Sequence, residues 1–257
     1  MNDAAFLPGR VVRRVLRQVG AHRMLLRWRV LESARSGEPE LRLLPCLVDP
    51  RRAAIDIGAA EGVYAFHLQR LARRCIAFEP NPSSYSELKR ALPQVELHQA
   101  AVSAVDGCAT LRVPVVGGVP YRGWGTIAAK NELAELQTHS VQEIKVRTMC
   151  PDRMELGEIG FIKIDVEGHE IDVLAGLAGV LARCLPNLLI EIGGAGRGGS
   201  LAQVRQRLDP LGYTALMLDA SGKLVALPNE VDFKGSINVI FVAMSKPARN
   251  TNPNRLG

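Results

Sequence analysis

The sequence predicts a three-layer α/β sandwich, in which helices cover both faces of a mostly parallel sheet of seven strands. Short, nearly continuous apolar runs alternate with longer segments of helical periodicity from residue 53 onward, which is the pattern of strands buried on both faces. The last two apolar runs lie about 20 residues apart, which leaves little room for a crossover helix. They therefore predict an antiparallel strand at the C-terminal edge of the sheet.

The same alternation predicts the elements in chain order. The predicted strands are 53–57, 74–79, 95–102, 159–165, 187–192, 214–218 and 237–243. The predicted helices are 63–73, 82–92, 168–182 and 200–211. Residues 103–150 interrupt the alternation, and the glycines of Gly117-Gly118 and Gly123-Trp124-Gly125 predict an irregular insertion or lid that carries substrate contacts.

The positive charge of the chain is concentrated in a basic N-terminal arm, residues 1–52. This arm holds 11 arginines and 5 acids, so its excess of +6 equals the formal charge of the whole chain. Residues 53–257 therefore balance to zero. We expect the main domain to span 53–245 and a disordered tail to follow at 246–257.

Residues 10–31 of the arm place apolar side chains at helical spacing beside arginines, which predicts one or two helices that break at Gly20. Three roles stay open for this arm: it docks on anionic lipid headgroups, it binds nucleic acid, or it covers the sheet edge with its arginines in solvent. Few aromatic residues are interleaved with the arginines, which disfavours nucleic acid. The sequence gives no prediction of the oligomeric state.

The composition is typical of a soluble globular protein, with 47% apolar and 23% charged residues. No apolar stretch has the length of a transmembrane helix or the pattern of a signal peptide. The five cysteines are scattered without paired spacing, which favours a reducing compartment and disfavours a disulfide framework or a zinc site. We therefore expect a cytoplasmic protein, peripheral at the inner membrane face if the arm binds lipid.

The most informative segment is 54–62, Ala-Ile-Asp-Ile-Gly-Ala-Ala-Glu-Gly, in which an apolar run with an acid leads into a glycine-framed turn. In nicotinamide-binding folds the corresponding turn has three glycines and cradles a pyrophosphate. Here Ala60 replaces the second glycine, and the carboxylate of Glu61 would repel a phosphate. The loop therefore favours a nucleoside cofactor without phosphate, such as S-adenosylmethionine.

Two acids stand where the first two predicted strands end. Asp56 suits the amino group of S-adenosylmethionine, and Glu79, about 20 residues later, suits the two ribose hydroxyls. Gly58 and Gly62 would let the backbone approach the ligand closely. The simpler alternative is a turn whose glycines only permit tight packing.

A second group of candidate residues follows the predicted strand 159–165. Alternation places Lys163 and Asp165 on one face, with Asp165 at the carboxyl end, where ligands bind in open α/β sheets. His169 begins the next helix, and Glu191 ends the adjacent strand in the same cleft. Asp165, His169 and Glu191 are candidates for a general base, metal ligand or acceptor clamp. A divalent cation, if present, would bind Asp165 and Glu191. Structural roles also stay open, with Lys163 as a buried ion-pair partner and His169 as a solvated residue.

With these segments the chain resembles the FkbM family of S-adenosylmethionine-dependent methyltransferases. The most specific match is 161–170, Phe-Ile-Lys-Ile-Asp-Val-Glu-Gly-His-Glu. The other matching segments are 55–64, 77–82, 101–103, 173–176, 188–192 and 238–242. The resemblance implies a Rossmann-like class I methyltransferase fold and O-methylation of a sugar, glycan or polyketide hydroxyl.

The chain departs from the family at two places. Ala60 stands where the family usually has Asn, and Met149-Cys150 stand where an Asp is common. The residues expected to bind the cofactor are Asp56, Gly58, Ala59, Ala60, Glu61, Gly62, Tyr64, Glu79, Pro80, Asn81, Ala101, Val102 and Asp165. Two alternatives stay open: an NAD(P)-dependent oxidoreductase on a related sheet, and a non-catalytic glycan-binding relative of the methyltransferase fold.

Overall fold

The fold was analysed in a computed structural model of the 257-residue chain. The structure describes residues 15–16, 18–36, 38–116, 118–128, 140–193, 201–228 and 235–243. The predicted tail at 246–257 and residues 1–14 of the arm lie outside these ranges.

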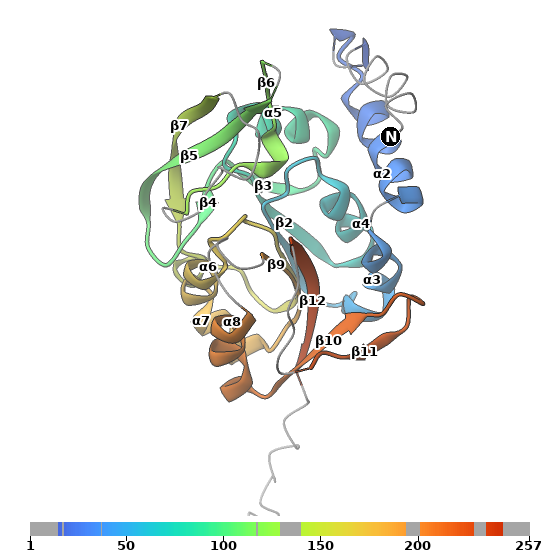
Figure 1. The fold of residues 1–257 in the computed structure, drawn as a ribbon, viewed down its shortest axis with the longest axis vertical. Helices are drawn as coiled ribbons and strands as arrows, with labels where there is room; N and C mark the ends of the chain where they lie inside the picture. The colour runs from blue at the N-terminus through green and yellow to red at the C-terminus, as the bar shows by residue number, and fades with distance from the viewer. Residues whose placement is uncertain are drawn as a thin grey trace, which may run out of the picture.

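The main sheet has eight strands in the order β11-β10-β12-β9-β8-β1-β2-β3, which confirms the predicted fold class (Figure 1). The strands are β1 (Ala53–Ile57), β2 (Arg74–Phe78), β3 (Glu96–His98), β8 (Ile159–Ile164), β9 (Asn187–Gly193), β10 (Tyr213–Leu218), β11 (Leu224–Ala226) and β12 (Ser236–Ala243). Strands β3, β2, β1, β8 and β9 are parallel, and β12 is antiparallel to both of its neighbours.

The C-terminal strand differs from the prediction in its position. Strand β12 pairs with β9 on one side and β10 on the other, so it lies inside the sheet and is not an edge strand. Its centre, Val239, Ile240 and Phe241, is fully buried and needs partners on both sides. The edge is instead formed by β11, an additional strand that is short and largely exposed, as suits an edge.

Helices cover both faces of the sheet and complete the three layers. They are α2 (His22–Ser36), α3 (Leu44–Leu47), α4 (Val63–Leu71), α5 (Pro82–Ala91), α6 (Glu170–Gly176), α7 (Ala178–Cys184) and α8 (Leu201–Leu208). Short 3-10 turns are η2 (Pro39–Leu43), η3 (Arg122–Trp124), η5 (Pro151–Arg153) and η6 (Asp209–Leu211). One face of the sheet packs with α6, α7 and α8, and the other packs with α2, α3, α4 and α5.

The predicted helix 168–182 is divided into α6 and α7 at Gly176. A Cβ atom at Gly176 would lie 2.2 Å from the carbonyl oxygen of Ser103, so only glycine allows this approach. The backbone turns there, and the Leu177 amide bonds to the carbonyls of Val173 and Leu174.

The predicted irregular insertion at 103–150 is a regular second sheet, of order β4-β7-β5-β6. Its strands are β4 (Ala101–Val102), β5 (Gly107–Val116), β6 (Val119–Pro120) and β7 (Ser140–Met149). Because β4 pairs with β7, the predicted strand 95–102 is divided between the two sheets. The long hairpin of β5 and β7 stands beside the main sheet, on the side opposite α2 (Figure 1).

The described part of the arm packs on the helix layer, and not on the sheet edge. Helix α2 lies against α4 and α5 and buries Leu25 and Leu26, whereas Gly20 has a φ of +69° and breaks the run as predicted. Arg29 is buried and binds Glu61 at 3.0 Å and Glu87 at 3.4 Å, so this arginine is not solvated.

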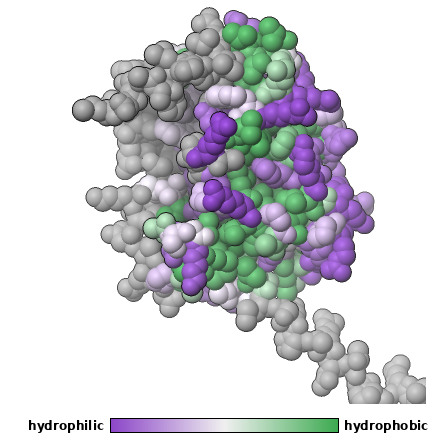
Figure 2. All heavy atoms as spheres, turned by 90° about the vertical axis from the view of Figure 1, so that its right-hand side faces the viewer, coloured by the Kyte–Doolittle hydropathy of each residue, from purple (hydrophilic) through white to green (hydrophobic). Residues whose placement is uncertain are grey.

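The outer surface on the α2 side mixes strongly hydrophilic residues with hydrophobic ones (Figure 2). On α2 itself, Met24 and Leu31 are exposed between the exposed arginines Arg23, Arg27 and Arg35. Within the described ranges, no helix is long and apolar enough to cross a membrane. Binding of the arm to lipid stays a prediction.

Candidate active site

A pocket opens at the carboxyl ends of β1, β2 and β8, between the main sheet and the second sheet. It encloses about 590 Å³, part of which is open to solvent. Nine residues predicted for the site line it: Gly58, Ala60, Glu79, Pro80, Asn81, Ala101, Val102, Asp165 and His169. The strand ends therefore bring together the candidates from the first loop and those that follow β8.

The loop after β1 is held tightly against the neighbouring strand ends. The amides of Gly58 and Ala59 both donate to the carbonyl of Phe78 at 3.0 Å. Gly58 has a φ of +81°, and a Cβ there would lie 1.8 Å from the carbonyl oxygen of Asp165, so no other residue fits. Gly62, in the left-handed region, begins α4. Ala59 and Gly62 thus shape the loop, whereas Gly58 and Ala60 line the pocket.

Glu79 clamps this loop with both oxygens of its buried carboxylate. Its Oε2 accepts the Ala60 amide at 2.7 Å, and its Oε1 accepts the Asn81 amide at 2.7 Å. Burial raises the pKa of Glu79 to about 7, although these two hydrogen bonds lower it. Each carboxylate oxygen keeps a further lone pair, so Glu79 can also accept hydroxyl groups of a ligand.

Asp56 is 1% exposed, and its Oδ2 has no hydrogen-bond partner. Burial raises its pKa to about 7, and the ammonium of Lys163 on the neighbouring strand opposes this rise. Asp56 does not line the pocket itself, but it precedes Ile57 and Gly58, which do. An unsatisfied buried carboxylate oxygen at this position fits a ligand that carries a positive charge, reached directly or through a water.

Lys163 is fully buried beneath the pocket, on the sheet face that packs with α4. Its Nζ lies 3.5 Å from Asp165 Oδ2, 3.4 Å from the Ile164 carbonyl oxygen and 5.2 Å from the ring centroid of Tyr64. Although burial lowers its pKa, the carboxylates of Asp165 and Glu191 outweigh that effect, so the pKa is raised and the ammonium stays charged. Lys163 therefore has the carboxylate partner that a buried lysine requires.

Asp165 directly follows β8 and lines the pocket with about one third of its side chain exposed. Its pKa is raised to about 6, because burial and the charge of Glu191 outweigh the ammonium of Lys163. A carboxylate of this pKa is mostly ionised at neutral pH and still accepts a proton readily, as a general base must.

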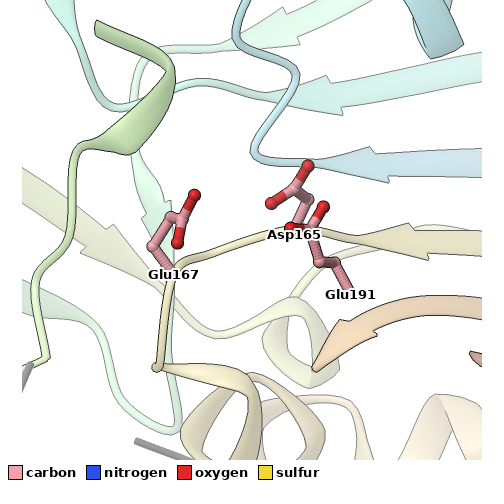
Figure 3. Close-up of side chains that lie close together, drawn as sticks. All are labelled: Asp165, Glu167 and Glu191. Atoms are coloured by element: carbon pink, nitrogen blue, oxygen red, sulfur yellow. The ribbon is translucent and has the colours of Figure 1, made fainter. Parts of the chain in front are cut away.

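Three carboxylates converge beside the pocket, from Asp165, Glu167 and Glu191 (Figure 3). One oxygen of each lies within 4.8 Å of the others. Glu191 does not line the pocket, and its Oε1 accepts the Ser236 hydroxyl at 2.6 Å. Oxygen ligands of this kind suit a hard divalent cation. Lys163, however, already supplies one positive charge to the cluster.

His169 lines the pocket, but both of its ring nitrogens have protein partners. Nε2 lies 3.1 Å from the Ser103 hydroxyl, and Nδ1 lies 3.2 Å from Asp172 Oδ2. Burial lowers its pKa, whereas Asp172 raises it. The side chain is 12% exposed, so the solvated role considered above is wrong, and the ring is held in one orientation.

Five predicted cofactor residues do not line the pocket, and besides Asp56, Ala59 and Gly62 these are Glu61 and Tyr64. The carboxylate of Glu61 points to Arg29 of α2, and Tyr64 is buried over Lys163, where Glu38 and burial raise its pKa. The region 103–150 contributes Leu111, Gly123, Gly125 and Ile127 to one wall of the pocket. The sequence predicted substrate contacts in this region, which stays a prediction, but it did not identify these four residues as site residues.

Comparisons with known proteins place the chain in one family. A model of the methyltransferase FkbM domain matches residues 56–215. The chain is 25% identical over 215 residues to the hexuronic acid methyltransferase AglP of Haloferax volcanii, which covers 80% of this chain and 78% of that protein. It is 24% identical over 182 residues to Methyltransferase 1 of Beauveria bassiana, which covers 62% and 71%.

Among solved structures, the chain is similar to a methyltransferase FkbM from Methylobacillus flagellatus KT, with a TM-score of 0.46 and 16% identity. The match covers 89% of this chain and 60% of that one.

Proposed function

Because the chain belongs to the FkbM methyltransferase family, we propose that it transfers a methyl group from S-adenosylmethionine to a hydroxyl of a sugar, glycan or related natural product. The family relationship establishes methyl transfer, whereas the oxygen acceptor and its class are the proposal. One observation carries it: a buried acid, Glu79, and a titratable carboxylate, Asp165, reach the same pocket from the ends of β2 and β8, the two strands that flank β1. The relative that acts on a hexuronic acid supports a sugar acceptor.

The residues present fit the cofactor. Glu79 would accept its ribose hydroxyls, and the unpartnered Oδ2 of Asp56 would attract its cationic amino group. Gly58 and Ala60 would let it lie against the backbone of the loop. When bound, S-adenosylmethionine supplies a methyl group that its positively charged sulfur has already activated.

Asp165 is the proposed general base. A sugar hydroxyl is a weak nucleophile, so its proton must leave as the new carbon–oxygen bond forms. Asp165 would accept that proton, and the cofactor, when bound, would supply the methyl group and keep the electron pair of its sulfur–methyl bond. The ammonium of Lys163, 3.5 Å away, keeps Asp165 ionised and oriented between turnovers. His169 holds its position through Ser103 and Asp172, and would contact the acceptor.

A divalent cation bound by Asp165 and Glu191 is a separate part of the proposal, supported by the convergence of their oxygens with that of Glu167. Such a cation would lower the pKa of an acceptor hydroxyl. Activity that survives dialysis against EDTA, and does not rise when Mg²⁺ is restored, would exclude it.

The test is turnover by the full-length protein. S-adenosylmethionine is incubated with a panel of glycans, and mass spectrometry follows both S-adenosylhomocysteine and acceptors heavier by one methyl group. We expect both products to form, and neither with the Asp165→Asn variant. Cofactor binding without turnover on any acceptor would favour the non-catalytic alternative. Absence of cofactor binding would reject the assignment of the pocket.

A further inference from the structure

Two aromatic side chains are exposed on the turn whose Gly123 and Gly125 line this pocket. Tyr121 is 43% exposed and Trp124 is 42% exposed, and no other aromatic residue in the described ranges is classed as exposed. Aromatic rings make large contributions when they are buried, so exposed ones at a pocket mouth commonly mark a binding surface.

The two rings form a fixed pair. Their centroids lie 4.9 Å apart, with planes at 37° to each other. Trp124 is the last residue of the short turn η3, and Tyr121 directly precedes the turn. The turn is anchored to the second sheet because the Tyr121 amide donates to the carbonyl of Pro114 at 2.8 Å. The Trp124 amide donates to the Tyr121 carbonyl at 3.2 Å and closes the turn. Hydrogen bonds therefore hold the backbone that carries the two rings.

The turn is also connected to the segment after β8 that contains Asp165 and Glu167. Gly123 and Gly125, on either side of Trp124, line the pocket together with Asp165 and Glu167. Thr126, which is buried, donates its hydroxyl to the carbonyl of Glu167 at 2.7 Å. Figure 3 shows the green turn beside Glu167. This connection holds the turn that carries the aromatic pair next to Glu167, which lines the pocket with Asp165.

We propose that Tyr121 and Trp124 form a stacking platform for a pyranose ring of the acceptor; this inference rests on the proposed function. A pyranose has a face of C–H bonds that matches the electron-rich face of an aromatic ring, whereas its hydroxyls point outward. Hydroxyls are donors, so a ring stacked here would present them to the carboxylates of Glu167 and Asp165. A Cβ built at Gly123 meets nothing within 4 Å, so the space beside the turn is open at this residue.

A sugar fits this surface better than a protein partner does. A stable protein interface usually buries more than about 1,000 Å² around an apolar core. Two aromatic rings beside a pocket lined by carboxylates do not provide such a core. They do provide what one sugar ring needs, which is a flat apolar surface next to hydrogen-bond acceptors.

The test measures binding of simple sugars to the full-length protein saturated with S-adenosylhomocysteine. The probes are the methyl α-pyranosides of glucose, mannose and galactose, followed by saturation-transfer NMR and tryptophan fluorescence. We expect at least one probe to bind with its C–H face against the protein, and Trp124→Ala and Tyr121→Ala to weaken it at least tenfold. Trp124→Phe should retain part of the affinity. Leu224→Ala, which removes an exposed apolar side chain on the distant strand β11, is the matched control and should change nothing.

The outcomes separate the platform from the methyltransferase assignment. Alanine variants that bind the sugars like the wild type would overturn the platform, as would a wild type that binds S-adenosylhomocysteine but none of the probes. If S-adenosylhomocysteine fails to bind while sugar binding still depends on Trp124, the platform stands and the proposed function fails. With an acceptor found by turnover, the alanine variants should raise KM at least tenfold and change kcat little.

Discussion

Lowering the pH from 8 to 6 should weaken the binding of S-adenosylmethionine, because two buried acids must be ionised to hold it. Burial raises the pKa of both Asp56 and Glu79 to about 7 in the free protein. A cationic ligand favours the ionised form of each acid, so binding releases the protons that these acids carry. Below pH 7 that release costs free energy, and above pH 7 it does not.

The size of the effect follows from those two pKa values. An acid of pKa about 7 that must lose its proton weakens the observed affinity about tenfold between pH 8 and pH 6, which is about 1.4 kcal/mol. If both Asp56 and Glu79 must ionise, the change approaches about 100-fold, or about 2.7 kcal/mol. Two acids therefore predict a steeper pH dependence than one.

Isothermal titration calorimetry in buffers of different ionisation enthalpy measures both the affinity and the number of protons released. We expect the wild type to release protons at pH 7, and Glu79→Gln or Asp56→Asn to release fewer while binding more weakly. Glu158→Gln, which changes an exposed carboxylate paired with Arg52, is the control and should behave like the wild type. An affinity that does not vary with pH, with no proton release, would refute the reasoning.

Three further changes test other parts of the site and the arm. Lys163→Met leaves buried carboxylates without their ammonium, so we expect the free energy of unfolding to fall by about 3–5 kcal/mol. We also expect the acidic limb of the pH profile of kcat to move above about pH 6. An unchanged pH profile would contradict the role given to the Lys163–Asp165 pair. Gly58→Ala forces a Cβ against the Asp165 carbonyl at a positive φ. We expect it to lower the free energy of unfolding by about 1–3 kcal/mol and to weaken cofactor binding. A wild-type stability in urea unfolding would show that the loop tolerates the change. Arg29→Met should lower the free energy of unfolding by about 1–3 kcal/mol. This loss is smaller than the loss expected when a fully buried ion pair is broken, because one partner of Arg29 is partly exposed. Chemical denaturation measures the change, and a stability equal to that of the wild type would show that the contact contributes nothing.

The central strands of the main sheet were predicted well from the sequence, because strands that are buried on both faces appear as short, nearly continuous apolar runs. The strands β1, β2, β8 and β9 begin and end within one residue of their predicted bounds. By contrast, the hairpin of β5 and β7 pairs residues far apart in the chain, and its pattern is interrupted by Pro114 and glycines, so it resembled a loop. The position of β12 was not predictable either, because apolarity indicates a buried strand without naming its neighbours.

For the site, acids at strand ends were a partial guide, since Asp56 and Glu191 do not line the pocket. Glu79 and Asp165 line the pocket because the sheet places the carboxyl ends of parallel strands along one edge. The direction in which the Glu61 side chain points could not be predicted from its position in the sequence. Its carboxylate turns toward Arg29, a residue of the arm that reaches the loop only through tertiary packing. The aromatic pair of η3 likewise depends on where the second sheet stands.

The contact of Arg29 with Glu61 and Glu87 has a consequence for any shortened form of this protein. Cutting the chain before residue 53 would uncover Leu68 and Leu88, which now pack in one cluster with Leu26. It would also leave two acids without their cation, one of them in the loop that begins α4. In a truncated enzyme the loop between β1 and α4 would be held less firmly. A weak affinity for S-adenosylmethionine measured on that form would then result from the loss of α2 and not from the pocket residues themselves.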